Sequence, residues 1–340
     1  MEDPPRPHAP TRKATASDVA READVSKWTV NRAFRSDASI APDSRARILD
    51  VAARLGYRPN MLARSLSTKS TQQVAVLVDD FGNPHKLQMM SLLTAALQRD
   101  NLVAVLININ ATSGHVEAML NADQRQVDAI VLLGTAFQTD ILQHHTRQQG
   151  GPPLFVIGRE SDFVGVTAVS CDPAVSMTAI GLHLWGRGYR RPGFLSGPRT
   201  LSTALGRKHH FAAFWRERGI ANVPELMGGS YDREPGSAAV ARYLAETPPG
   251  ARFDVLMCEN DALAFWAMDV VRSGYGLRIP GDLAVVGYDG SDLAGHPAYG
   301  LTTYEQPMAE MVDQVVSMIV GRIAPHSHNL PGRLLVRQST

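Results

Sequence analysis

Two groups of polar residues in this chain have types and spacing that suit binding chemistry. The first lies in the segment TASDVAREADVSKWTVNRAF at 15–34, where small apolar residues separate the larger polar and aromatic ones, Lys27, Trp28, Asn31 and Arg32. On a helix whose small apolar residues face inward, these larger side chains lie toward solvent or a ligand. Basic and aromatic side chains on such a face are compatible with a nucleic-acid partner.

The second group follows short apolar runs that are typical of strands. Asn260 and Asp261 come shortly after the run at 253–257, and Asp289 comes directly after the run at 283–288. Asp80 and Asn83 follow the run at 74–78 in the same way. Ligands of parallel α/β sheets bind beyond the carboxyl ends of the strands. Asn and Asp also cap loops at such places, and that role is the commoner one, so the residue types alone leave both interpretations open.

The composition is that of an ordinary soluble globular protein with about two domains. The chain has 340 residues, of which 44% are hydrophobic and 20% charged. No apolar run approaches the roughly 18 residues that a membrane span needs, and the N-terminal MEDPPRPHAPTRK has no apolar stretch typical of a secretory signal. The two cysteines, Cys171 and Cys258, form no metal-binding spacing. We therefore expect a cytoplasmic protein with no membrane partner, no cofactor and no metal.

Charge is distributed unevenly along the chain. Residues 11–70 hold 12 Lys and Arg against 6 Asp and Glu, a net charge of +6. Residues 71–340 hold 21 basic and 25 acidic groups, a net charge of −4. A small basic head on a mildly acidic body indicates a polyanionic partner for the head alone.

The basic head is predicted to fold as a helix-turn-helix domain over 12–58, after a disordered tail at 1–11. Thr15 and Asp18 have the spacing of a capping box, and Ser26 can cap a second helix after a turn at Asp24. Pro42 suits the first position of a third helix, which Gly56 ends. Short side chains between helices permit the close crossing that this motif requires. A three-helix bundle without a nucleic-acid role remains the alternative on these residues alone.

The body alternates short apolar runs with longer helical patterns. The runs lie at 74–78, 102–108, 129–133, 154–157, 193–196, 253–257 and 283–288. Near-continuous apolar strands separated by amphipathic helices predict βαβ units and parallel, doubly wound sheets covered on both faces. About 270 residues of this pattern exceed one open sheet of usual size, so we expect two α/β lobes.

The chain resembles the LacI/GalR family of bacterial transcription regulators from about Thr15 to its C-terminus. The most specific stretches are DVAREADVSKWTVNRAF, LGYRPNMLARSL, NDALAFWAM at 260–268, AVVGYDG at 284–290 and LTTYEQP at 301–307. The resemblance implies a helix-turn-helix head joined to a two-lobed, periplasmic-binding-protein-like body. Lobe one would comprise 73–171 and 304–330, and lobe two 172–303 and 331–340, ending in the strand LLVRQ at 334–338.

By the same resemblance, the second helix reads bases in the major groove of a palindromic operator. Residues 59–72 would form a hinge helix and linker whose leucine wedges into the minor groove. The implied DNA-binding residues are Ser26, Lys27, Trp28, Thr29, Asn31, Arg32, Arg45, Asn60, Ala63 and Leu66. This chain departs from the family in having Asp24 where Gly is usual and in having Trp28 at a base-reading position. Trp28 would then contact a thymine methyl or a sugar, or would cover the helix bundle.

The resemblance also implies an effector site between the lobes. The implied effector-binding residues are Phe81, His85, Arg159, Arg207, Tyr231, Asn260, Asp289 and Gln306. A guanidinium, a carboxylate and an amide suit the donors and acceptors of a sugar diol. Gly158 stands where some sugar-responsive relatives have Asp.

These observations predict a repressor that binds operator DNA as a homodimer, or a dimer of dimers, and that responds to a small polar effector such as a sugar. A protein corepressor or a non-sugar metabolite is the alternative effector, and a sugar-binding protein without a regulatory role is a more remote alternative. The sequence has no P-loop, G-x-S-x-G or G-x-G-x-x-G motif at a strand–helix junction, so these motifs do not favour an enzyme. The histidine pairs at 144–145, 209–210 and 326–328 lack the spacing of a metal site.

Overall fold

The structure is a computed structural model of the chain that describes residues 13–34, 38–59, 70–109, 122, 124–134, 151–161, 163, 165–198 and 206–340. It divides into two units, residues 1–71 and 72–340, each of which forms its own core. The expected tail at 1–11 and the hinge residues Asn60, Ala63 and Leu66 lie outside the described residues.

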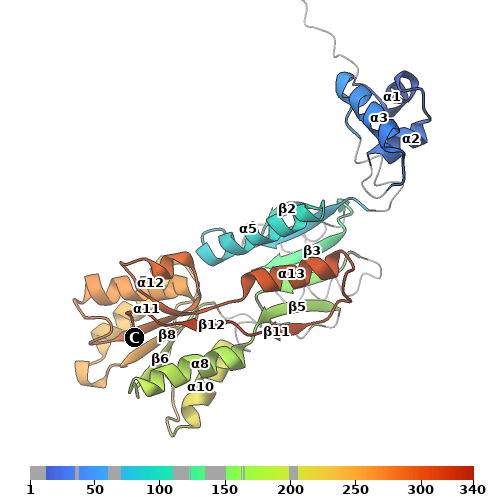
Figure 1. The fold of residues 1–340 in the computed structure, drawn as a ribbon. Helices are drawn as coiled ribbons and strands as arrows, with labels where there is room; N and C mark the ends of the chain where they lie inside the picture. Colours follow the sequence, from blue (N-terminus) through green and yellow to red (C-terminus); the bar gives the residue numbers. More distant parts are fainter. Residues whose placement is uncertain are drawn as a thin grey trace, which may run out of the picture. The chain divides into compact units, whose positions relative to one another are not determined.

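The first unit holds three short helices that pack on one another (Figure 1). They are α1 (Ala16–Glu22), α2 (Lys27–Ala33) and α3 (Pro42–Arg54). The Thr15 hydroxyl oxygen accepts a hydrogen bond from the Asp18 N–H, and the Asp18 carboxylate accepts one from the Thr15 N–H, so the predicted capping box is present. Ser26 caps α2 through the Thr29 N–H, and Pro42 occupies the first turn of α3.

The core of this unit is small and built from short side chains. Its buried members come from all three helices: Val19, Ala20, Ala23, Val30, Ala33, Ile48, Val51 and Ala52. Four alanines among eight core residues let the helix axes approach closely, as a helix-turn-helix requires.

The second unit contains two six-stranded sheets, and the first sheet has the order β11-β5-β4-β3-β1-β2 with every pair parallel. Its strands, in that order, are His328–Leu330, Val166–Cys171, Leu154–Ile157, Ala129–Leu133, Gln73–Val78 and Val103–Asn108. Strands β1, β3 and β4 are almost wholly buried because the sheet is covered on both faces. Helices α5 (Pro84–Arg99) and α13 (Met308–Ile319) pack side by side against one of those faces.

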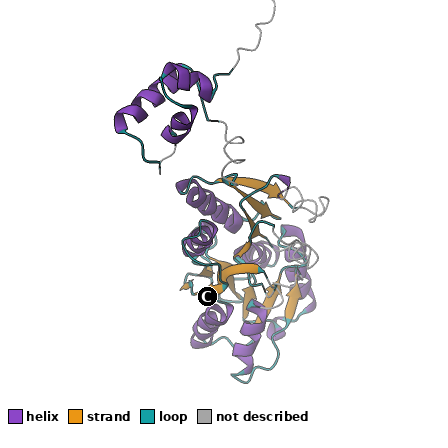
Figure 2. Cartoon of the chain, turned by 90° about the vertical axis from the view of Figure 1, so that its right-hand side faces the viewer, coloured by secondary structure: helices purple, strands orange, loops and turns teal. Residues whose placement is uncertain are grey.

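The second sheet has the order β12-β10-β9-β8-β6-β7. Its strands, in that order, are Arg333–Leu335, Thr302–Glu305, Ala284–Asp289, Val255–Cys258, Pro192–Ser196 and Glu225–Met227. All pairs are parallel except the edge pair β10–β12. Among the described residues, the α-helices of this lobe are α8 (Pro173–Gly186), α10 (Arg207–Arg216), α11 (Arg233–Glu246) and α12 (Asp261–Asp269). Figure 2 shows strands of the body lying between helices.

The chain passes between the two sheets three times, after β5, after β10 and between β11 and β12. Strand β10 (Thr302–Glu305) belongs to the second sheet, so the return to lobe one comes after Glu305 and not at 304 as expected. The final strand is β12 (Arg333–Leu335), shorter and earlier than the expected 334–338. The expected strands of the apolar runs are all present; the bounds of two of them, 129–133 and 154–157, are those expected, and the others differ by one or two residues. The fold is therefore the predicted two-lobed α/β body with a helix-turn-helix head.

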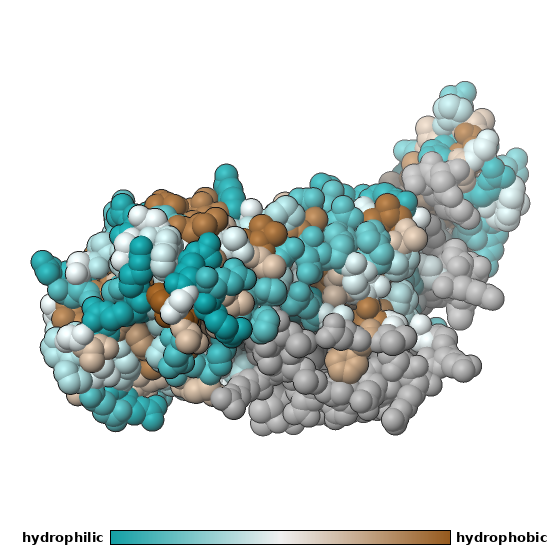
Figure 3. Space-filling view, turned by 90° about the horizontal axis from the view of Figure 1, so that it is seen from below, coloured by the Kyte–Doolittle hydropathy of each residue, from teal (hydrophilic) through white to brown (hydrophobic). Residues whose placement is uncertain are grey.

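Over the described residues, no helix combines the length and the apolar character that crossing a membrane would require. The face seen in Figure 3 is mainly hydrophilic, with apolar side chains in small groups.

Candidate functional site

The described DNA-binding candidates gather on the outer face of α2. Val30 and Ala33 face the core, whereas Lys27, Trp28 and Asn31 are exposed. Trp28 is 65% exposed and does not belong to the core cluster. Of the two roles expected for Trp28, covering the bundle is therefore the one that the structure contradicts.

Trp28 and Arg32 lie one helical turn apart and contact each other. The Arg32 guanidinium carbon lies 4.4 Å from the centre of the Trp28 ring, a cation–π arrangement. The same guanidinium donates to the Ser39 carbonyl. Two contacts thus hold the only arginine of α2 in one orientation on the exposed face.

The remaining described candidates in the head make contacts within the head. The Ser26 and Thr29 hydroxyl oxygens lie 2.8 Å apart, and the Thr29 N–H donates to Ser26 at the start of α2. Arg45, at the start of α3, donates to the Ala38 carbonyl over 2.8 Å. Ser26 and Arg45 thus stand at the N-termini of neighbouring helices, where backbone N–H groups and a guanidinium suit phosphate oxygens.

The turn between α1 and α2 is formed by Asp24 in the left-handed region, with φ of +51°. Glycine enters this region at little cost, whereas most side chains do not. Asp is one of the few other residues that tolerate it. The departure from the usual Gly therefore leaves the helix-turn-helix geometry intact.

A cavity between the two lobes holds seven of the eight predicted effector residues. It has about 780 Å³ of empty space, its open mouth included. The predicted residues that line it are His85, Arg159, Arg207, Tyr231, Asn260, Asp289 and Gln306. Phe81 is not among the lining residues and is 37% exposed.

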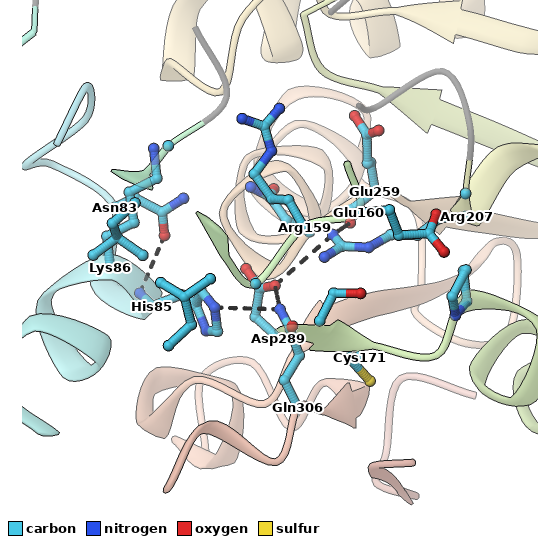
Figure 4. Close-up of a pocket in the computed structure, with 18 of the residues that line it drawn as sticks. Asn83, His85, Lys86, Arg159, Glu160, Cys171, Arg207, Glu259, Asp289 and Gln306 are labelled. Carbon is cyan, nitrogen blue, oxygen red and sulfur yellow. Dashed lines mark hydrogen bonds and ion pairs between the residues drawn. The ribbon is translucent and has the colours of Figure 1, made fainter. Parts of the chain in front are cut away.

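The carboxylate of Asp289 lies at the centre of this cavity (Figure 4). The Gln306 Nε2 donates to Asp289 Oδ1 over 2.8 Å and lies 3.2 Å from His85 Nε2. Arg207 Nη1 lies 3.9 Å from the same Oδ1. Asp289 is the last residue of β9 and has φ of +125°, so the strand end is twisted to present this side chain.

Arg207 opens α10 and is fixed by three groups of the second lobe. Its Nη1 donates to the Glu259 carbonyl over 2.6 Å, and its guanidinium carbon lies 3.7 Å from the centre of the Tyr288 ring. Burial alone would lower the pKa of Arg207, but Tyr288 and Asp289 raise it above its ordinary value. Arg207 is thus a permanent, oriented cation beside the Asp289 carboxylate.

A second wall of the cavity is formed by Tyr231, Glu259 and Arg159. The Tyr231 hydroxyl lies 3.4 Å from Glu259 Oε2, which also accepts the Gly197 N–H over 2.5 Å. The Tyr231 ring fills the space that a side chain at Gly197 would occupy. Burial raises the pKa of Glu259 and lowers that of Arg159 to about 10. This wall offers a ring face and a guanidinium.

Asn260 lines the cavity and also begins α12. Its Oδ1 accepts the Leu263 N–H over 2.9 Å, as an N-cap does, which leaves its amide nitrogen available to a ligand. The Asn260 side chain can therefore cap α12 through its oxygen and contact a ligand through its nitrogen at the same time.

A buried carboxyl lies behind Asp289. Asp261 accepts hydrogen bonds from the Ser291 N–H and hydroxyl, each over 2.8 Å, and from the Thr303 hydroxyl over 2.6 Å. Burial and the neighbouring Asp289 raise the pKa of Asp261 to about 7. Burial raises the pKa of Asp289 to about 6, against the effects of Arg207 and Gln306.

Sequence reasoning missed Lys86 and Glu259, which also line the cavity. Lys86 is 5% exposed and pairs with Asp79 at the end of β1. The sequence signal that could have identified Lys86 is its position directly after His85, in a helix that begins shortly after the end of β1. Glu259 precedes the Asn260–Asp261 pair that the sequence singled out. Among the described residues, no group of three or more His, Cys, Asp or Glu is placed to hold a metal ion.

Comparison with protein families and known proteins agrees with this arrangement. Residues 15–60 match the family described as bacterial regulatory proteins, lacI family, and residues 182–340 match a periplasmic binding protein-like domain. An HTH-type transcriptional regulator of Mycolicibacterium smegmatis is 29% identical over 96% of this chain and 93% of its own length. The ribose operon repressor of Haemophilus influenzae is 27% identical over 96% of each chain.

The fold is also that of a solved regulator. The lac repressor dimer bound to operator and an anti-inducer superposes with a TM-score of 0.82 at 22% identity, covering 97% of this chain and 99% of that one. None of these three proteins is named as an enzyme. Along the chain, the match to the lacI family comes first and the match to the periplasmic binding protein-like domain follows. The two relatives match this chain over nearly its whole length. This chain therefore has the DNA-binding domain of the lacI family of bacterial regulatory proteins, followed by a periplasmic binding protein-like domain.

Proposed function

We propose that this protein is a transcriptional repressor that binds a palindromic operator as a homodimer and is controlled by a sugar. The observation that carries the proposal is the cavity between the lobes, where Arg207, Asn260 and Asp289 meet. These side chains come from three different segments of the second lobe, and Gln306 adds an amide from the connection to the first lobe.

The donors and acceptors of the cavity favour a polyol. Carboxylate oxygens of Asp289 accept hydroxyl protons, and the Arg207 guanidinium donates to hydroxyl oxygens. Among the described lining residues, Tyr231 has the only carbocyclic aromatic ring, so the two-sided stacking that a nucleobase favours is absent from that part of the wall. The ribose operon repressor, a relative along the whole chain, is consistent with a sugar effector.

The DNA-binding part of the proposal rests on the head. Lys27, Trp28 and Arg32 present basic and aromatic groups on the exposed face of a helix that enters the major groove in this family. The net charge of +6 over residues 11–70 supplies attraction to phosphates whatever the sequence. Such a protein acts in the cytoplasm, where bacterial DNA lies.

A dimer is supported by exposed apolar residues on one edge of the first lobe. Leu87 and Leu92 of α5 and Val103 and Leu106 of β2 are between 37% and 59% exposed. Strand β2 is also the edge of its sheet, with one side unpaired among the described strands. Exposed apolar side chains beside an edge strand suit burial against a second copy.

Repression follows if the dimer holds two heads on adjacent half-sites near a promoter. An effector that binds the cavity changes how the lobes sit and thereby the spacing of the two heads, which is a coupling between two distinct sites. A protein corepressor would act on the same spacing from outside and would leave the cavity unfilled.

The test has two arms and uses the full-length protein. A randomised duplex pool is selected for binding, and the enriched sequence is expected to be a palindrome. Thermal unfolding is then followed with a panel of sugars and nucleosides, where a ligand at 100 times its dissociation constant stabilises the fold by about 2.7 kcal/mol. Enrichment without a palindrome would exclude the dimer on a symmetric site. A response to nucleosides but not to sugars would exclude the sugar effector.

A further inference from the structure

The cavity contains a buried chain of three side chains that joins both lobes. His85 lies in the first turn of α5 in lobe one, Gln306 lies in the connection between lobes, and Asp289 ends β9 in lobe two. All three are less than 9% exposed. Figure 4 shows the Gln306 amide between the His85 ring and the Asp289 carboxylate.

Chemistry fixes the orientation of the Gln306 amide. An ionised carboxylate only accepts hydrogen bonds, so the group 2.8 Å from Asp289 Oδ1 must be the amide nitrogen. The second N–H of this nitrogen then points to His85 Nε2, 3.2 Å away. The Gln306 backbone N–H also donates to the Asp289 carbonyl over 3.3 Å, which anchors the segment on which the amide sits.

This orientation also fixes the proton of His85. A ring nitrogen that accepts from an amide N–H carries no proton, so the proton of neutral His85 must lie on Nδ1. Burial, Arg207 and Lys86 lower the pKa of His85 to about 3, which keeps the ring neutral at physiological pH. The Asn83 side chain caps the start of α5 by accepting from the His85 N–H, which fixes the backbone that carries the ring.

Among the described residues, two buried polar atoms of this arrangement have no hydrogen-bond partner, His85 Nδ1 and Gln306 Oε1. Unpartnered buried polar atoms are unfavourable and are kept only where other contacts outweigh them. The bridge between the lobes is therefore a state that a competing ligand can displace. Asp289 Oδ1, one of the two carboxylate oxygens to which a sugar hydroxyl could donate, already accepts a hydrogen bond from Gln306.

We propose that His85 is a positioning residue that holds the Gln306 amide on Asp289, so that the first lobe controls access to the carboxylate of the effector site. An effector hydroxyl that takes Asp289 Oδ1 releases Gln306, and this breaks the link to α5. This inference rests on the proposed effector site and adds the residue through which lobe one responds to it.

The first experiment needs no effector. Full-length protein labelled with ¹⁵N in its 11 histidines is studied by NMR correlations that distinguish the two ring nitrogens. His85→Gln assigns the His85 signals, and His183→Gln, at a half-buried histidine bonded to Thr340, is the matched control. We expect a neutral ring protonated at Nδ1 from about pH 7 to about pH 8, where the Asp289 carboxyl, with its pKa of about 6, is ionised. In Gln306→Leu, the proton should move to Nε2. A charged ring, or a proton on Nε2 in the unmodified protein, would overturn the proposal.

The second experiment measures binding of D-ribose, D-xylose, D-glucose and D-galactose by calorimetry. His85→Leu removes the acceptor and should tighten binding of the responsive sugar roughly two- to tenfold, the value of one hydrogen bond. His85→Gln restores a side-chain acceptor and should bring the affinity back toward that of the unmodified protein. Weaker binding in His85→Leu would show that His85 contacts the sugar itself and would overturn the positioning role. If none of the four sugars binds, the proposal that the effector is a sugar is wrong. The NMR measurement of the His85 tautomer still tests the proposed role of His85 in that case.

Discussion

At the scale of single residues, Arg32 is the side chain whose loss should alter base preference. It is the only arginine of α2 and is held by Trp28 and Ser39 on the exposed face. Arg32→Ala should weaken binding to the selected operator by about 1–3 kcal/mol and relax the preference at one base pair of each half-site. Binding assays on a set of singly substituted duplexes measure both effects. Arg47→Ala, at an exposed arginine of α3, is the control, and an equal loss on random DNA would argue against base reading by Arg32.

Asp289 and Arg207 are expected to act in effector binding and not in DNA binding. Removing either side chain takes away the acceptor or the cation at the centre of the cavity, while the head keeps all its own contacts. Asp289→Ala and Arg207→Ala should therefore abolish the sugar-induced thermal shift and leave operator affinity within about twofold. Release of operator by sugar in both variants would place the effector elsewhere.

The buried carboxyls Asp261 and Asp289 make the stability depend on pH. Their pKa values are raised to about 7 and about 6 from an ordinary 3.8, so the folded protein holds protons that the unfolded chain releases above about pH 4. Their contribution to stability is thus greatest below that pH and is lost as the pH rises through 6 and 7. The pKa of His85 is lowered from 6.5 to about 3, so its contribution has the opposite sign: it makes the stability rise with pH between these two values.

The variant Asp261→Asn separates the effect of the carboxyls on the pH dependence from that of His85. Between about pH 5 and about pH 8, Asp261→Asn should lose less stability than the unmodified protein, because one titrating carboxyl is gone. The slope of the melting temperature against pH is the quantity to compare, since the substitution also alters the hydrogen bonds of Ser291 and Thr303. Parallel slopes would show that Asp261 is ionised throughout.

At the scale of elements, the turn between α1 and α2 gives a test of local strain. Asp24 lies at φ of +51°, where a side chain costs energy that glycine does not incur. Asp24→Gly should stabilise the head by roughly 0.5–1 kcal/mol, and Asp24→Ala should destabilise it. Thermal unfolding of the head transition in the full chain distinguishes the two variants. If both destabilise, the Asp24 side chain contributes an interaction that outweighs the strain.

Elements with strong local signals could be predicted from the sequence, and those that depend on distant partners could not. The runs at 74–78 and 129–133 are continuous apolar segments, and they form two neighbouring interior strands of the first sheet. Strand β5 contains Thr167 and Ser170, which interrupt the apolar pattern. Strand β11 has only three residues and pairs with β5, 159 positions away, as Asn329 does with Ser170. Nothing local in either segment indicates that pairing.

The candidate site shows the same division. Asn260 and Asp289 follow recognisable strands, so their positions at the sheet edge were predictable. Lys86 and Glu259 were not, because charged residues are rarely buried and only the folded structure supplies Asp79 and the Gly197 N–H as their partners. The boundary at 304 failed for a related reason: β10 and the crossover after it form one continuous segment in sequence, LTTYEQP.

At the scale of the whole molecule, the chain combines two binding modules with opposite electrostatic character. The head carries a net charge of +6 over residues 11–70 and the body a net charge of −4. The described part of the head has a core of eight buried residues, most of them small, so its own contacts give it little stability and little area for a specific interface. Affinity for DNA must therefore come largely from phosphate contacts and from holding two heads together, whereas a neutral sugar is recognised by short-range hydrogen bonds.

This difference predicts opposite responses to salt in one protein. Each phosphate neutralised by the head releases counterions, so six such contacts would lower operator affinity roughly a thousandfold between about 50 mM and about 200 mM salt. Sugar affinity should stay within about twofold over the same range, because a neutral ligand displaces no counterions. Fluorescence anisotropy with the selected duplex and calorimetry with the responsive sugar measure the two responses on the same sample. Arg278→Gln, at an exposed arginine of the body paired with Asp282, should leave the DNA slope unchanged, whereas Lys27→Gln should reduce it by about one contact. A DNA slope that falls equally in both variants would mean that the body, and not the basic head, supplies the phosphate contacts.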